Sequence, residues 1–161
     1  LDLAANNRGV DFVFKLHPAD VKGEPSRKYA GDHKLKNLRF IVQEHTVAEL
    51  VPSASVIVID LVSTSVLQTL LSDKPVFIYT GMYRMDERAR ALLKKRAFIY
   101  DRFEDLCCDL EIFFSEGLQP LLKRYGADLT NTEFIREFGT FCHDGKSAVR
   151  AADILSTILD G

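Results

Sequence analysis

The sequence contains few cysteines, and their spacing excludes two common ways of stabilising a small protein. The three are Cys107, Cys108 and Cys142, an odd number in which two residues are adjacent. Adjacent cysteines are poor partners for a disulfide framework, and the spacing lacks the C-x-x-C pattern of zinc sites. We therefore expect no disulfides and no metal site, in a reduced, cytoplasmic setting.

The chain also lacks an excess of charge and any long apolar run. Lysine and arginine number 21 against 23 aspartate and glutamate residues, which gives a formal net charge of -2. This balance provides no general attraction to nucleic acid or to an anionic membrane. No run approaches the roughly 18 apolar residues of a membrane-spanning helix, and no charged-then-apolar leader pattern is present. We expect no nucleic-acid partner, while peripheral contact with the inner face of the membrane stays open.

The rest of the composition is typical of one folded domain. Hydrophobic residues make up 47% of the 161 residues and charged residues 27%, as in soluble globular domains. A chain of this length can bury a substantial single core. It begins at Leu1, without Met, in a segment that resembles the end of a helix. We therefore expect residues 1–161 to form a single domain that is a fragment of a longer protein.

Short apolar runs alternate with helical patterns, which favours a doubly wound, Rossmann-like α/β fold with a parallel sheet and extra C-terminal helices. The predicted strands are Val10–Leu16, Leu38–Val42, Ser55–Asp60, Pro75–Tyr79 and Ala97–Tyr100. Helices are predicted over Thr46–Val51, Ser63–Leu71, Asp86–Arg96, Phe103–Ser115, Gly117–Tyr125, Thr130–Phe141 and Ser147–Leu159. The polar stretch from Ala19 to Lys36 is expected to be a long crossover.

The third predicted strand leads into the most informative part of the sequence. Three hydroxyl residues, Ser63, Thr64 and Ser65, follow it and precede a helical pattern that ends before Pro75. A helix that begins just after the carboxyl end of a parallel strand directs free N–H groups into the crevice where such sheets bind ligands. A phosphate or diphosphate is the expected ligand, although hydroxyl residues are also common as simple helix caps.

Other polar side chains are expected at the same edge of the sheet. His17 follows the first strand and could pair with a phosphate or act as a general base. Lys15 alternates with His17 and so faces the same side of the strand. Tyr83 lies in the loop after the fourth strand, where it could reach a base or an acceptor. The cluster Lys94–Arg96 is expected to lie in solvent and complement a helix dipole.

Three segments, taken together, resemble a known family. They are Phe-Lys-Leu-His-Pro at 14–18, the hydroxyl turn and helix of Ser63–Val76, and Asp-Gly-Lys-Ser-Ala at 144–148. In this order they resemble the donor-binding C-terminal half of GT-B-fold transferases, most closely the capsule-polysaccharide and CDP-glycerol glycerophosphotransferase groups. The resemblance implies a nucleotide-activated sugar or polyol phosphate as donor, a surface polysaccharide as product, and an N-terminal domain that this chain lacks.

The resemblance also implies roles for individual residues. His17 would be catalytic, and the family position of Gln68 usually carries a Glu that holds the ribose of the nucleotide. Because Gln lacks the negative charge, its bond to ribose is expected to be weaker, and Gln68 could also simply face solvent. No cofactor is implied, since helix N–H groups and cations would stabilise the leaving diphosphate. The donor-binding residues would be Lys15, Ser63, Thr64, Ser65, Gln68 and Tyr83.

Two other functions fit the same pattern. A nucleotide-sugar epimerase of this architecture uses a similar turn but favours a Glu on the ribose, so Gln68 counts against it. The chain could also be a non-catalytic α/β module in which Gln68 marks a decayed site. If the transferase prediction is right, the isolated 161-residue chain should bind nucleotide without turnover, because the acceptor would be bound mostly by the N-terminal half.

Overall fold

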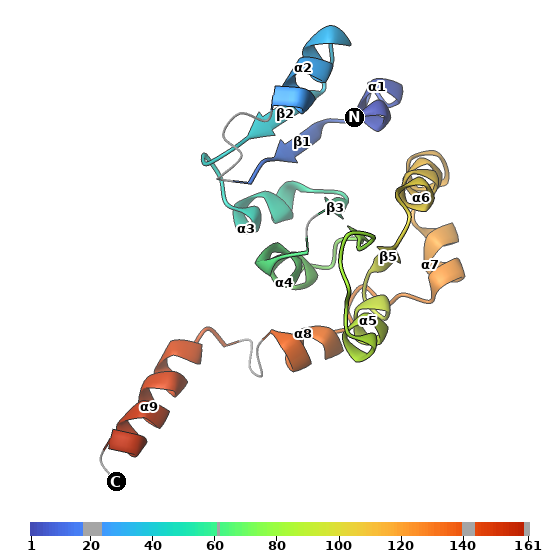
Figure 1. The fold of residues 1–161 in the computed structure, drawn as a ribbon. Coiled ribbons are helices and arrows are strands. Elements are labelled where there is room, and N and C mark those ends of the chain that lie inside the picture. Colours follow the sequence, from blue (N-terminus) through green and yellow to red (C-terminus); the bar gives the residue numbers. More distant parts are fainter. Residues whose placement is uncertain (18–23, 61, 140–143, 160–161) are drawn as a thin grey trace.

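The computed structural model describes residues 1–17, 24–60, 62–139 and 144–159, in which strands and helices alternate up to α6 (Figure 1). The strands are β1 (Phe12–Lys15), β2 (Leu38–Ile41), β3 (Ile57–Ile59), β4 (Val76–Tyr79) and β5 (Phe98–Tyr100). The helices are α1 (Asp2–Asn6), α2 (Glu24–Asp32), α3 (Val47–Leu50) with the 3-10 turn η1 (Val51–Ser53), α4 (Thr64–Leu70), α5 (Glu87–Lys94), α6 (Phe103–Glu116), α7 (Gln119–Tyr125), α8 (Glu133–Phe138) and α9 (Ser147–Leu159).

The described strands form two parallel sheets. β1 pairs with β2, and β3, β4 and β5 form a second sheet in that order. The α/β class and the parallel pairing predicted from the sequence are thereby confirmed, whereas no ladder hydrogen bond joins β1 to β3 into a single sheet. Within each sheet, parallel pairing places the carboxyl ends of the strands at one edge.

The three-stranded sheet is covered by helices on both faces. Val76 and Ile78 of β4 are fully buried in a cluster with side chains from α4, α5 and α8. The intervening Phe77 is also fully buried, in a second cluster with side chains from α6 and α7. Because side chains alternate along a strand, a run that is apolar at every position is what a strand covered on both faces requires.

Helix α2 lies within the segment that the sequence predicted as a crossover. Its sequence, Glu-Pro-Ser-Arg-Lys-Tyr-Ala-Gly-Asp, has too few apolar residues for a clear helical period. Tertiary contacts compensate: Ala30 is buried in a third cluster with Ala4 and Leu35, and the Tyr29 hydroxyl donates to Asp2. Residues 19–23, the first part of the predicted crossover, lie outside the described residues, as does Pro18 of the 14–18 motif.

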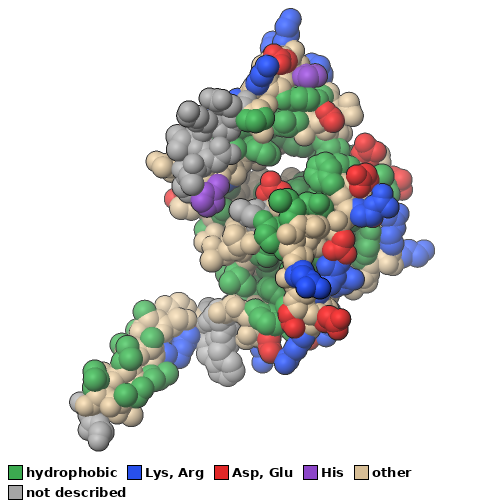
Figure 2. Space-filling view, in the orientation of Figure 1, with side chains coloured by type: hydrophobic (Ala, Val, Ile, Leu, Met, Phe, Trp, Pro, Cys, Tyr) green, Lys and Arg blue, Asp and Glu red, His purple; other side chains and the backbone are tan. Residues whose placement is uncertain are grey.

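Helix α9 extends away from the rest of the chain in Figure 1. Its bounds agree with the prediction, and Asp144 accepts hydrogen bonds from the Lys146 backbone and the Arg150 side chain at its start. The helix has no buried residue, and Figure 2 shows hydrophobic side chains exposed along it. Neither α9 nor any other helix in the described part of the chain has the length and apolar character needed to cross a membrane.

Candidate functional site

The turn between β3 and α4 has the capping geometry that the sequence predicted. Ser63 is the N-cap, and its Oγ lies 2.8 Å from the Ser65 Oγ and accepts from the Ser65 backbone N–H at 3.4 Å. The Ser63 carbonyl accepts from Val66 N–H at 3.0 Å. Among the described residues, the backbone N–H and hydroxyl of exposed Thr64 have no partner. The cap therefore uses Ser63 and Ser65 and leaves Thr64 able to bind a ligand.

Packing determines which face of α4 is open. Val66, Thr69 and Leu70 are buried, and Val66 and Leu70 belong to the cluster that includes β3 and β4 side chains, which fixes the rotation of the short helix. Thr64 and Gln68, one turn apart, are both exposed. The two polar side chains therefore lie together on the solvent side of the helix.

A hydrogen-bonded group that sequence reasoning missed lies at the carboxyl ends of β4 and β5. The Thr80 hydroxyl is buried and donates to the Asp101 carboxylate at 2.9 Å, and Arg90 makes two hydrogen bonds to Asp101, at 2.8 and 2.5 Å. Arg90 and Thr80 hold the pKa of Asp101 below its usual value. The only signal in the sequence was a polar residue directly after each strand.

This group supports the loop that carries Tyr83. Gly81 lies so close to its neighbours that an added Cβ would be 2.2 Å from the Asp101 backbone oxygen. After Gly81 the chain turns outward, and Met82 and Tyr83 are 75% and 38% exposed. Because β3 and β4 are adjacent, Tyr83 follows the strand next to the one that leads into the α4 turn.

Lys15 and His17 lie at the carboxyl end of β1, in the other sheet. His17 is exposed, whereas Leu16 before it is buried. The Lys15 ammonium donates to the backbone carbonyls of Leu16, at 3.1 Å, and Val42. Of the predicted residues, the structure therefore brings Ser63, Thr64, Ser65 and Gln68 together, puts Tyr83 on the adjacent strand end, and leaves Lys15 and His17 on a separately hydrogen-bonded sheet.

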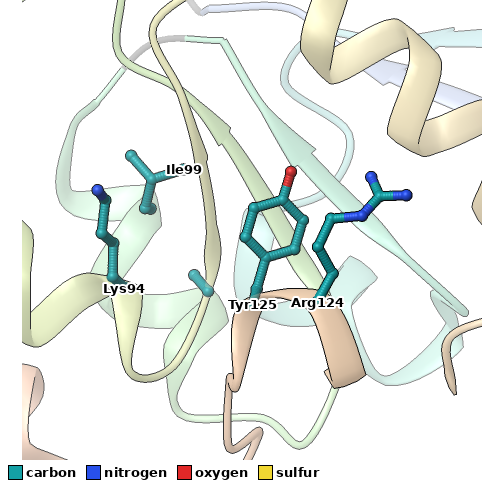
Figure 3. A pocket seen from close by; sticks show the side chains of 5 residues that line it. Lys94, Ile99, Arg124 and Tyr125 are labelled. Carbon is teal, nitrogen blue, oxygen red and sulfur yellow. The ribbon is translucent and has the colours of Figure 1, made fainter. Parts of the chain in front are cut away.

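A hollow lies near the opposite end of β5. It measures about 280 Å³ and is lined by Lys94, Ala97, Ile99, Arg124 and Tyr125. Figure 3 shows the charged ends of Lys94 and Arg124 directed away from each other on opposite sides of the Tyr125 ring. The Arg124 guanidinium is paired with the buried carboxylate of Asp109. The positive charge of Arg124 is thus neutralised by Asp109, and the charged groups around the hollow do not point to a common ligand position.

Arg96 corrects one expectation from the sequence. It was predicted to lie in solvent with Lys94 and Lys95, but its side chain is fully buried. The guanidinium donates to the backbone carbonyl of Lys74 at 3.1 Å and to that of Ser72. It therefore supplies hydrogen bonds to two backbone carbonyls just after α4. Burial lowers the pKa of this group. Local sequence gave no indication that these carbonyls would lie beside Arg96.

The described residues contain no group of three or more histidine, cysteine, aspartate or glutamate side chains that could hold a metal ion. Asp144 of the Cys142–Asp144 segment accepts a hydrogen bond from the Lys146 backbone N–H just before α9. Cys142 and His143 lie outside the described residues.

The three motifs that resemble GT-B transferases occupy separate places in the fold. The first ends β1, the second runs from the α4 turn into β4, and the third opens α9. No family model matches this chain, and no curated protein or solved structure is significantly similar to it.

Proposed function

We propose that this chain is the donor-binding half of a GT-B-type transferase that uses a nucleotide-activated sugar or polyol phosphate to build a capsule or teichoic acid. One observation carries the proposal. The Ser63–Ser65 turn follows the carboxyl end of a parallel strand, and the N–H and hydroxyl of Thr64 remain open beside an exposed Gln68. This is an arrangement of donors suited to a diphosphate, with an amide one turn away that can bind a ribose hydroxyl.

The proposed mechanism is electrostatic. As the donor bond breaks, negative charge develops on the leaving diphosphate or nucleotide. The open N–H and hydroxyl of Thr64 at the α4 turn stabilise that charge, and the exposed imidazole of His17 contacts the donor phosphate or assists the transfer. The N-terminal half of such an enzyme binds the acceptor. The reaction takes place in the cytoplasm, with peripheral contact with the inner face of the membrane through the acceptor.

The proposal includes one doubly wound sheet. In it the β1–β2 pair continues the three-stranded sheet beyond β3, the side on which Figure 1 places the pair. That continuation would bring His17 to the same edge as Thr64. A nucleotide bound between His17 and Thr64 would contact both the β1–β2 pair and the three strands β3 to β5.

Calorimetry with CDP, UDP and GDP tests the proposal. We expect binding heat with at least one nucleotide, and its loss when Ser63→Ala and Thr64→Ala are combined. Ser156→Ala on α9 removes an exposed hydroxyl far along the chain and should leave binding unchanged. If none of the three nucleotides binds the unmodified chain, the transferase proposal fails and a non-catalytic α/β module is the better description.

A further inference from the structure

The Lys15 side chain bridges the carboxyl ends of β1 and β2. At this end of the pair, Leu16 N–H donates to Ile41 O at 2.8 Å. Beyond that bond, the Lys15 ammonium donates to the carbonyls of Leu16, at 3.1 Å, and Val42. Backbone carbonyls at the end of a ladder have no strand partner and need another donor. Lys15 supplies it to one carbonyl from each strand.

Glu44 provides the complementary contact for backbone N–H groups. Its Oε2 accepts from Val42 N–H at 2.7 Å and from Gln43 N–H at 3.0 Å. Hydrogen bonds from the backbone, including its own N–H, lower the pKa of the Glu44 carboxyl, with a smaller contribution from the charge of Lys15. Glu44 is therefore ionised at neutral pH. We call Lys15 and Glu44, with the backbone groups they bind, the strand-end clasp.

The clasp holds the residue directly before His17. Leu16 is only 5% exposed, its N–H is bonded to Ile41 and its carbonyl is bonded to Lys15. Leu16 is thus held from across the β1–β2 ladder through its N–H. Its carbonyl, which belongs to the peptide group that joins it to His17, is held by the Lys15 side chain of β1. An exposed imidazole that follows a fixed peptide has a restricted position.

We infer that Lys15 is a positioning residue for His17 and not a direct ligand of the donor phosphate. An ammonium has three donors, and here two already bind carbonyls of the strand ends. Turning those two donors toward a phosphate would leave the carbonyls without partners, so only the third donor could reach a phosphate without disturbing the strand ends. The role of His17 toward the donor rests on the proposed function, whereas the clasp itself can be tested without any ligand.

The ligand-free test compares Lys15→Met with Lys36→Met by NMR. Lys36 is an exposed lysine just before β2, so its variant controls for the loss of one charge. In Lys15→Met we expect the Leu16 amide to exchange roughly five- to ten-fold faster, as for the loss of one net hydrogen bond. The imidazole resonances of His17 should move as well, and Lys15→Arg should restore them in part. If exchange and resonances are the same in both methionine variants, the inference is wrong.

The second test is a double-mutant cycle with whichever of CDP, UDP and GDP binds. If Lys15 acts through His17, Lys15→Met combined with His17→Gln binds no more weakly than His17→Gln alone. If the two losses multiply, Lys15 contacts the nucleotide independently and the inference is overturned. Should the unmodified chain bind no nucleotide, the proposed function fails together with any role of Lys15 toward a donor. Amide exchange and the imidazole spectrum then still decide whether Lys15 positions His17.

Discussion

Gly81 is required by the space around it. A Cβ at this position would lie 2.2 Å from the Asp101 backbone oxygen and 2.6 Å from the Tyr79 hydroxyl. We expect Gly81→Ala to lower the free energy of unfolding by about 1–3 kcal/mol, because backbone atoms would have to move. Urea denaturation would measure the change in stability. The NMR resonances of exposed Tyr83, which lies in the same loop, should also shift.

Gly31 is the matched control for Gly81. It lies inside α2, and an added Cβ would meet nothing within 4 Å. Gly31→Ala should therefore raise the free energy of unfolding by about 0.5–1 kcal/mol through helix propensity alone. Equal effects of the two substitutions would contradict the close contact described for Gly81.

Gln68 allows a direct test of the proposed nucleotide site. A carboxylate accepts a charge-assisted hydrogen bond from a ribose hydroxyl, which is stronger than the bond to an amide oxygen. We expect Gln68→Glu to lower the dissociation constant for the bound nucleotide by roughly three- to ten-fold. Gln119→Glu, at the exposed start of α7, should have no effect in the same calorimetric titration. Unchanged or weaker binding by Gln68→Glu would argue against ribose at this position.

Single residues differ in how far the sequence reveals their role. The capping role of Ser63 follows from residue type and from a position after a strand, and the structure confirms it. The burial of Arg96 depends on carbonyls more than twenty positions away. Asp101 also depends on residues outside its own segment, since it is hydrogen-bonded to Thr80, 21 positions away, and to Arg90, 11 positions away. Contacts of this kind are set by strand order, so no local pattern predicts them.

Among elements, the strands and their parallel pairing were predictable, whereas their division between two sheets was not. Apolar runs marked every described strand, since each run is too short for a buried helix and rich in β-branched or aromatic residues. Each predicted strand was longer than the observed one by one to three residues in total, because the pattern continues beyond the paired positions. Helix α2 lacks a hydrophobic period, and its contact with α1 could not be anticipated from its own sequence.

Asp109 joins three elements. This buried carboxylate on α6 accepts from the Tyr100 hydroxyl of β5, at 3.0 Å, from the Tyr125 hydroxyl of α7, and from Arg124. Burial, followed by the charge of Asp109, raises the pKa of Tyr100 well above its usual value. Burial and the hydrogen bond to Asp109 also raise the pKa of Tyr125.

These raised pKa values predict loss of stability at alkaline pH. A tyrosine whose pKa is raised by folding stabilises the native state fully below its unfolded pKa of about 10 and loses that contribution as the pH rises above it. Urea denaturation between about pH 8 and 11 should show the decline, and Tyr100→Phe should make it smaller. At neutral pH Tyr100→Phe should cost about 1 kcal/mol for the lost hydrogen bond. Tyr83→Phe, in an exposed loop, should keep the unmodified pH dependence.

For the whole molecule, the apolar face of each predicted helix could be identified from the sequence, but not which of these faces the core would include. The buried clusters lie between the sheets and helices α1, α2 and α4 to α8. Helix α9 has an equally regular apolar spacing, yet Ile154, Leu155 and Ile158 are 59% to 68% exposed. Periodicity indicates that a helix has an apolar face, whereas a contact partner decides whether that face is buried.

Two leucines test whether α9 contributes to folding of the domain. Leu121 of α7 has no exposed surface, whereas Leu155 of α9 is 59% exposed. Both are helical, so helix propensity changes equally in Leu121→Ala and Leu155→Ala. We expect Leu121→Ala to lower the free energy of unfolding by about 2–5 kcal/mol, because it opens a cavity in the core. Leu155→Ala should change it by no more than about 0.5 kcal/mol, as for other exposed positions. A loss of similar size in both variants, measured by urea denaturation, would mean that α9 packs against the domain in solution.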